Sequence, residues 1–118
     1  MSLTVSRCML IDGDLEPIET EDYSVKLAGF ESWRHVLCGS DIVQRLGVTL
    51  LVELRTQDIY CHPEQLPQLE HDIHIILENT LFIAQETGIE EESIRFRAGN
   101  ILKAVTWAKE NGGGVIIW

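Results

Sequence analysis

The feature that most constrains the fold of this chain is the order of two hydrophobic periodicities. Near the start, apolar and polar residues alternate, as in residues 3–11 (LTVSRCMLI), which is the period of a β-strand. Between residues 66 and 110, apolar residues recur every three or four positions, which is the period of an amphipathic α-helix. Strand-period segments followed by long helix-period segments, with no repeated β-α-β unit, predict an α+β fold.

Four segments are expected to be β-strands, and alternation of the kind seen in them is typical of an antiparallel sheet with one wet face. They are residues 3–11, 23–28, 48–57 and 115–118. In the first strand the face that we expect to be buried carries Leu3, Val5, Met9 and Ile11. In the third strand it carries Leu50, Val52 and Leu54. The first two strands are expected to pair across a loop of about eleven residues, which begins at Asp12.

The remaining segments are expected to be helical. A short helix over residues 31–38 would place Trp33, Val36 and Leu37 on one face, and a second would begin at Ser40 and end at Gly47. Two long helices are expected over residues 66–87 and 90–110. The sequence therefore predicts a single domain, residues 1–118, in which an antiparallel sheet of about four strands packs against a C-terminal helical hairpin and a final short strand follows.

Charge excludes one broad class of function. The 118 residues include nineteen acidic and nine basic side chains, for a formal charge of −10. Binding to nucleic acid needs a basic face, so we expect no nucleic-acid partner. The longest apolar runs are about five residues, against the roughly 20 that a membrane-spanning helix needs, so no membrane span is expected either.

Cysteine usage indicates the compartment. Cys8, Cys38 and Cys61 are odd in number and widely spaced, whereas small secreted domains usually carry even numbers of paired cysteines. The N-terminal residues lack a basic region followed by a long apolar stretch, so no signal peptide is expected. These features predict a cytoplasmic protein.

The faces of the long helices opposite their core stripes carry unexpected apolar residues. On the first helix Ile75 and Phe82 are seven residues apart and stack on one line. The second helix has Phe96, Asn100, Lys103 and Trp107 within about 60° of one another. Either another part of the chain, such as residues 12–34, covers these faces, or they form a protein–protein interface or a small-molecule pocket. A homo-oligomer is the commonest form of such an interface.

The acidic residues are concentrated in two runs. Residues 58–92 hold nine acids and no base, and residues 12–22 hold six acids and no base. Glu70, Asp72 and Glu78 are expected to form an electrostatic rim that attracts a basic protein. Small acidic inhibitor proteins and bacterial immunity proteins, which block basic nucleases, share this size and charge. A protein whose acidic helices mimic DNA is a third possibility.

No catalytic motif is present, so we expect a non-enzymatic protein. The cysteines lack the basic surroundings of a nucleophile, and the sequence contains no nucleotide-binding glycine loop or hydrolase signature. The alternative function is a small metal- or ligand-binding protein that uses a His/Glu helix face. His71 and His74, three residues apart, are its candidate zinc ligands, with Glu78 one turn further on and Cys61 nearby.

Overall fold

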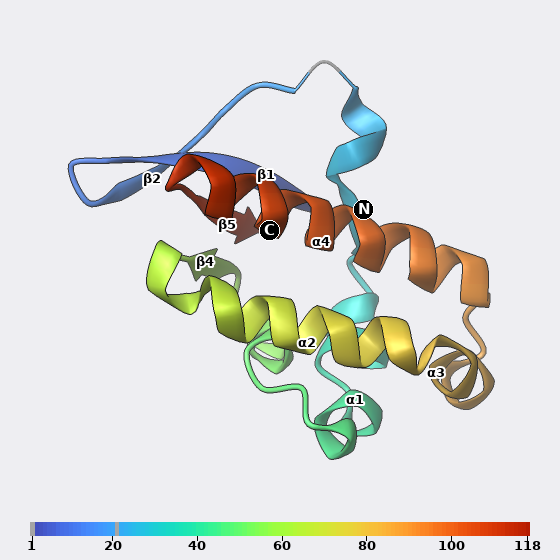
Figure 1. Cartoon of the computed structure of the whole chain (residues 1–118). Helices are drawn as coiled ribbons and strands as arrows, with labels where there is room; N and C mark the ends of the chain where they lie inside the picture. The colour runs from blue at the N-terminus through green and yellow to red at the C-terminus, as the bar shows by residue number, and fades with distance from the viewer. Residues whose placement is uncertain (1, 21) are drawn as a thin grey trace.

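The computed structural model describes residues 2–20 and 22–118, and it contains an antiparallel sheet of five strands. These are β1 (Ser2–Ile11), β2 (Asp14–Pro17), β3 (Leu27–Phe30), β4 (Ile59–Cys61) and β5 (Gly114–Ile117). The order is β2-β1-β5-β4 (Figure 1). Strand β3 pairs with the N-terminal end of β1. The final strand β5 therefore lies in the middle of the sheet, between β1 and β4.

In the described residues, four α-helices and four short helical turns complete the fold. The α-helices are α1 (Asp41–Leu46), α2 (Leu66–Glu78), α3 (Thr80–Thr87) and α4 (Glu91–Asn111). The turns are η1 (Tyr23–Lys26), η2 (Arg34–Cys38), η3 (Leu51–Arg55) and η4 (Pro63–Gln65). Helix α4 packs on β1 and β5, and α2 packs on α4 (Figure 1). The predicted α+β fold, with a C-terminal helical hairpin and a final short strand, is confirmed.

Several helix boundaries follow from capping residues. The Ser40 hydroxyl accepts a hydrogen bond from the Val43 amide and starts α1, while Gly47 ends it with a φ of 111°. Gly88 ends α3 and Gly112 ends α4 in the same left-handed conformation. Gly113 and Gly114 then allow β5 to approach its neighbours, because a Cβ at either position would overlap the carbonyl oxygen of Cys8 or Cys61.

The first hairpin differs from the prediction. Asp12 and Gly13, with φ values of 52° and 86°, form a two-residue turn of the type that suits hairpins, so β1 pairs directly with β2. Residues 23–28, predicted as the second strand, instead form the turn η1 and enter β3. Met9 and Ile11, predicted to be buried, are 38% and 53% exposed. Strand β5 pairs with residues 5–8 of β1, so the end of the β1–β2 hairpin extends beyond β5.

The predicted strand over residues 48–57 is wrong. Leu51–Arg55 form the helical turn η3, which buries Leu51 and Leu54, three residues apart, instead of alternate residues. The carboxylate of Asp72 accepts hydrogen bonds from the amides of Leu50 and Leu51 and holds the start of this turn. The residues have strand-like alternation, but a buried acceptor on α2 decides their conformation.

Two further predictions fail in detail. Val36 was expected to share the buried face of Trp33 and Leu37, but its side chain is 43% exposed because η2 is a π-helical turn with different spacing. The predicted helix over residues 66–87 is interrupted at Asn79, where α2 ends and α3 begins. This interruption exposes Leu81 and creates the surface described next.

Candidate functional site

One predicted binding residue, Asn100, is inside the protein. Its side chain is 2% exposed, and its amide nitrogen donates hydrogen bonds to the carbonyl oxygens of Ser24 (2.9 Å) and Leu27 (2.8 Å). The segment that leads into β3 therefore covers this side of α4. Asn100 is therefore not available to a partner. For this residue the first alternative is correct: part of residues 12–34 covers the helix face.

Ile75 and Trp107 are also largely used within the chain. Both are partly buried and pack against the hydrophobic core. Ile75 faces Gly47 at the end of α1, where a Cβ would lie 3.5 Å from its Cδ1 atom. Trp107 approaches Gly113 in the turn before β5. These side chains fix the positions of neighbouring elements and offer little area to another molecule.

The three residues of the predicted acidic rim have different surroundings and do not form one exposed surface. Asp72 is fully buried, and it accepts hydrogen bonds from the amides of Thr49 (3.0 Å), Leu50 (2.7 Å) and Leu51 (2.9 Å) and from the Thr49 hydroxyl. Its predicted place on an exposed rim is therefore wrong. Glu70 is partly buried and forms an ion pair with Lys109 at 3.0 Å. Glu78 is exposed.

Phe82 and Phe96 are exposed, at 46% and 47%, but they belong to different surroundings. Phe96 lies beside Arg97, whose guanidinium carbon is 5.8 Å from the centre of the Phe96 ring and 4.5 Å from that of Phe30. Lys103, on the same helix, is exposed. Phe82 lies on α3 next to Leu81, which is 59% exposed.

Leu81 and Phe82 border an open hollow of about 470 Å³ at the junction of α2 and α3. We call this the elbow surface and define it by the residues that matter for its chemistry: Glu78, Leu81, Phe82, Gln85, Glu91 and Arg95. Large apolar side chains exposed beside a hollow are typical of interaction sites. A continuous helix over residues 66–87 would place Leu81 on the same side as the core residue Ile73 and one turn from Leu77, and the helix break at Asn79 is the reason that it is exposed.

A polar cluster beneath the elbow surface holds the two helices in place. The buried hydroxyl of Thr80 donates a hydrogen bond to the Glu91 carboxylate at 2.7 Å and accepts one from Arg95 at 2.9 Å. Arg95 also forms an ion pair with Glu91 at 3.0 Å. The Asn79 amide donates to the carbonyl oxygen of Ile75, one turn back in α2. The start of α3 is thereby fixed to the first turn of α4, so the hollow exists before any partner arrives.

The charges around the elbow surface are mostly negative. Glu78, Glu86, Glu90 and Glu92 are exposed carboxylates in or beside α3 and at the start of α4. The positive charge of Arg95 is matched by its ion pair with Glu91. Of these carboxylates, Glu78 lines the hollow and Glu86 is one helical turn from Phe82, and negative charge at these positions is complementary to a basic protein surface.

The predicted metal ligands His71 and His74 are exposed on α2. Within residues 2–20 and 22–118, the structure brings together no group of three or more His, Cys, Asp or Glu side chains that could hold a metal ion. Cys61, considered as a further ligand, is buried, and its thiol lies near the carbonyl oxygen of His62. The structure therefore gives no support to a zinc site on this helix face.

The three cysteines are free and buried. Burial raises the pKa of the Cys38 thiol and of the Cys61 thiol to about 12, and it also raises the pKa of Cys8. A nucleophilic cysteine needs a lowered pKa and access to solvent. These three thiols have a raised pKa and are buried, so they lack both properties. An internal void near Cys38, of about 10 Å³ and lined by apolar residues, is too small for an organic ligand.

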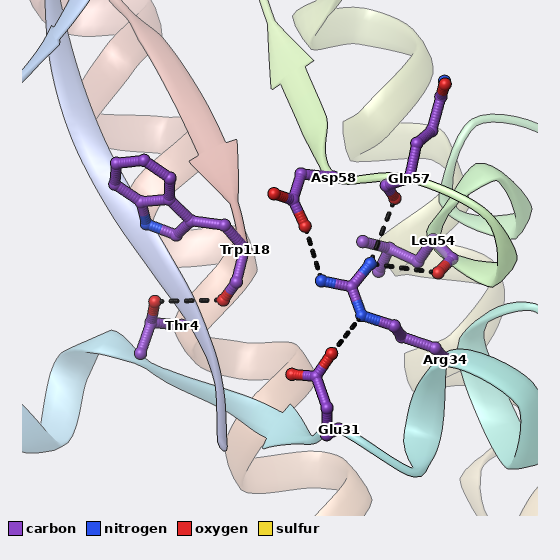
Figure 2. Close-up of polar contacts among 7 residues, drawn as sticks. All are labelled: Thr4, Glu31, Arg34, Leu54, Gln57, Asp58 and Trp118. Atoms are coloured by element: carbon purple, nitrogen blue, oxygen red, sulfur yellow. Dashed lines mark hydrogen bonds and ion pairs between the residues drawn. The ribbon is translucent and has the colours of Figure 1, made fainter. Parts of the chain in front are cut away.

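Arg34 forms a structural network. Its guanidinium donates hydrogen bonds to the carbonyl oxygens of Leu54 and Gln57, both at 3.1 Å, and it forms ion pairs with Glu31 and Asp58 (Figure 2). The side chain thereby joins η2 to the end of η3 and to the residue before β4. All its donor groups face partners inside the chain, so Arg34 holds the fold rather than a ligand.

Comparison with protein-family models, curated protein sequences and solved structures gives no match for this chain. In the described part of the chain, no helix has the length and apolar character needed to cross a membrane.

Proposed function

We propose that this protein is a non-enzymatic binding domain whose elbow surface docks a basic protein. The observation that carries the proposal is the position of Leu81 and Phe82, two exposed apolar side chains beside a preformed hollow that the carboxylates of Glu78 and Glu91 also line. Most of the energy of a protein interface comes from a few anchors in a desolvated centre, and charged residues at the rim chiefly increase the association rate. The elbow surface has both parts.

Preorganisation favours this surface over the other exposed apolar residues. The hydrogen bonds among Thr80, Glu91 and Arg95 hold the junction in place, so a partner need not order it on binding. The whole protein resembles small acidic inhibitor and bacterial immunity proteins in charge and size. A basic nuclease or toxin is therefore one suitable class of partner. Three free cysteines accord with a cytoplasmic location, which forms part of this proposal.

The experiment is capture of the partner from extracts of the source cells, followed by reconstitution of the complex from purified components. We expect the captured protein to be basic and its affinity to fall as salt rises. Replacing the anchor by Phe82→Ala should cost about 2 kcal/mol of binding free energy, or about thirtyfold in Kd. Glu78→Lys together with Glu86→Lys should mainly slow association.

The matched control is Phe96→Ala, which removes an equally exposed phenylalanine from the other side of α4. It should leave the affinity of the reconstituted complex within about twofold of the original. If the partner is acidic, or if Phe96→Ala weakens the complex and Phe82→Ala does not, the elbow surface is not the binding site.

A further inference from the structure

We infer that the outer face of the sheet is the interface of a homodimer. Helix α4 covers one face of β1 and β5, and the outer face is the opposite one, formed by even-numbered residues 4–10 of β1 and the residues opposite them. In its central row Ser6 lies opposite Ile116, which lies opposite Tyr60. Ser6 and Ile116 are each only 2% exposed, so the larger side chains around them form the accessible part of this face. Tyr60 and Trp118 are 53% and 41% exposed on this face, and Leu10 is 39% exposed.

The outer face differs from the rest of the surface in its charge. None of its positions on β1, β2, β4 or β5 holds an acidic or basic residue, whereas Asp14 and Glu16 of β2 fall on the opposite face. The Trp118 indole lies along β1 (Figure 2). It donates a hydrogen bond to the Ser6 hydroxyl at 3.1 Å. This contact satisfies both polar groups and leaves the aromatic ring as a fixed apolar surface.

Charge also selects the occupant. With a net charge of −10, two copies of this chain repel each other wherever their acidic surfaces meet. The strand positions of the outer face are where two copies can pack with no carboxylate opposite another, and the one carboxylate next to β4, that of Asp58, is paired with Arg34. A basic partner gains nothing there, because the face offers it no opposite charge.

The sheet edges are poor alternatives for self-association. Strand β4 has three residues and β2 ends at Pro17, and short strands and proline both limit pairing at an edge. Two copies would therefore meet face to face about a two-fold axis, which closes the assembly at a dimer.

The size of the face indicates how strong the dimer is. A rectangle of four strands about 4.8 Å apart, with seven residues of β1 at about 3.3 Å each, has an area of about 300 Å² in plan. The face is smaller than this, because β2, β4 and β5 have only three or four residues each. A stable interface buries about 800 Å² on each partner, so we expect a reversible, concentration-dependent dimer.

The test is sedimentation velocity over a concentration series up to about 1 mM, where a dimer with a Kd of about 100 µM would be mostly formed. The average mass should rise from 13.4 kDa towards twice that value. Tyr60→Glu would place two carboxylates in the interface and should weaken association at least tenfold. The control Tyr23→Glu changes a tyrosine that is 61% exposed on η1, and it should leave association unchanged.

Leu10→Glu is a second variant, at the other end of the face, for the case that Tyr60→Glu disturbs the fold. Circular dichroism shows whether each variant is folded. A wild-type protein that stays monomeric throughout the series overturns the inference, whether the face then binds neutral phosphatidylcholine vesicles or another protein. Association unchanged in folded Tyr60→Glu and Leu10→Glu also overturns it. These variants leave the elbow surface intact, so either proposal can fail without the other.

Discussion

Asp72 gives the sharpest test of how this fold is held together. Its carboxylate is fully buried and accepts three backbone hydrogen bonds and one from the Thr49 hydroxyl, so it supplies the acceptors that start η3. Asp72→Ala would leave the buried amides of Leu50 and Leu51 without acceptors. Each such orphaned group costs about 1–3 kcal/mol, so we expect a loss of about 4 kcal/mol in the free energy of unfolding. The whole domain has only about 6–18 kcal/mol at this length.

Asp72→Asn tests the same point with almost no change of shape. One carboxamide oxygen can still accept, but the amide nitrogen would face backbone N–H groups, and the charge-assisted bonds are lost. We expect a loss of about 2–3 kcal/mol. The control is Glu70→Gln on the same helix, where an ion pair with Lys109 near the surface is broken for less than about 1 kcal/mol.

The assay is urea unfolding followed by far-UV circular dichroism, with the free energy taken from variants that share one m value. If Asp72→Asn loses no more stability than Glu70→Gln, the carboxylate does not hold η3. The account of why residues 48–57 fail to form a strand would then be wrong.

Two further predictions concern the glycines and the thiols. Gly114→Ala should destabilise the protein by about 1–3 kcal/mol in the same assay, because its Cβ would overlap the Cys61 carbonyl oxygen. Gly99→Ala, where a Cβ in α4 meets open space, should stabilise the protein by about 0.5–1 kcal/mol. Equal effects of the two substitutions would refute the close approach of Gly114 to Cys61. Cys38 and Cys61 should resist iodoacetamide at pH 8 until the protein unfolds, and rapid labelling of the native chain would refute their burial. Burial raises the pKa of each of these two thiols to about 12, so their contribution to the free energy of unfolding is fully present below about pH 9. That contribution is lost as pH rises towards 12, by up to about 1.4 kcal/mol per pH unit for each thiol.

Much of the fold follows from local patterns in the sequence. The strand β1, the helix α4 and the buried final strand β5 have strong periodicity and clear ends, such as the acidic first turn of α4 and Gly112 after it. The helix α1 follows from Ser40 and Gly47 alone. These elements need no distant contact to be recognised.

The remaining elements depend on contacts that periodicity does not contain. Residues 51–55 alternate like a strand, but a carboxylate 21 residues away in sequence makes them helical. The break at Asn79 interrupts the helical period, and it turns Leu81, two residues later, from the core side to the surface. Asp12 and Gly13 are a hairpin signal in the sequence, and the predicted longer loop is wrong because these two residues form the turn themselves.

The candidate site was predictable only in part. Phe82 and Glu78 were identified from their place opposite the core stripe, and both lie on the elbow surface. Asn100 and Asp72 shared the same helix faces but are buried, because neighbouring segments need their hydrogen bonds. Helical spacing shows which side chains share a face, and it does not show which segment covers that face.

The measurement that tests the central claim most directly is amide hydrogen exchange of the reconstituted complex with its basic partner. The account predicts that binding slows exchange in α3 and in the first turn of α4, where the elbow surface lies, and leaves the end of the β1–β2 hairpin unchanged. Slower exchange in the hairpin or in η1, with α3 unchanged, would contradict the claim that the elbow surface binds the partner.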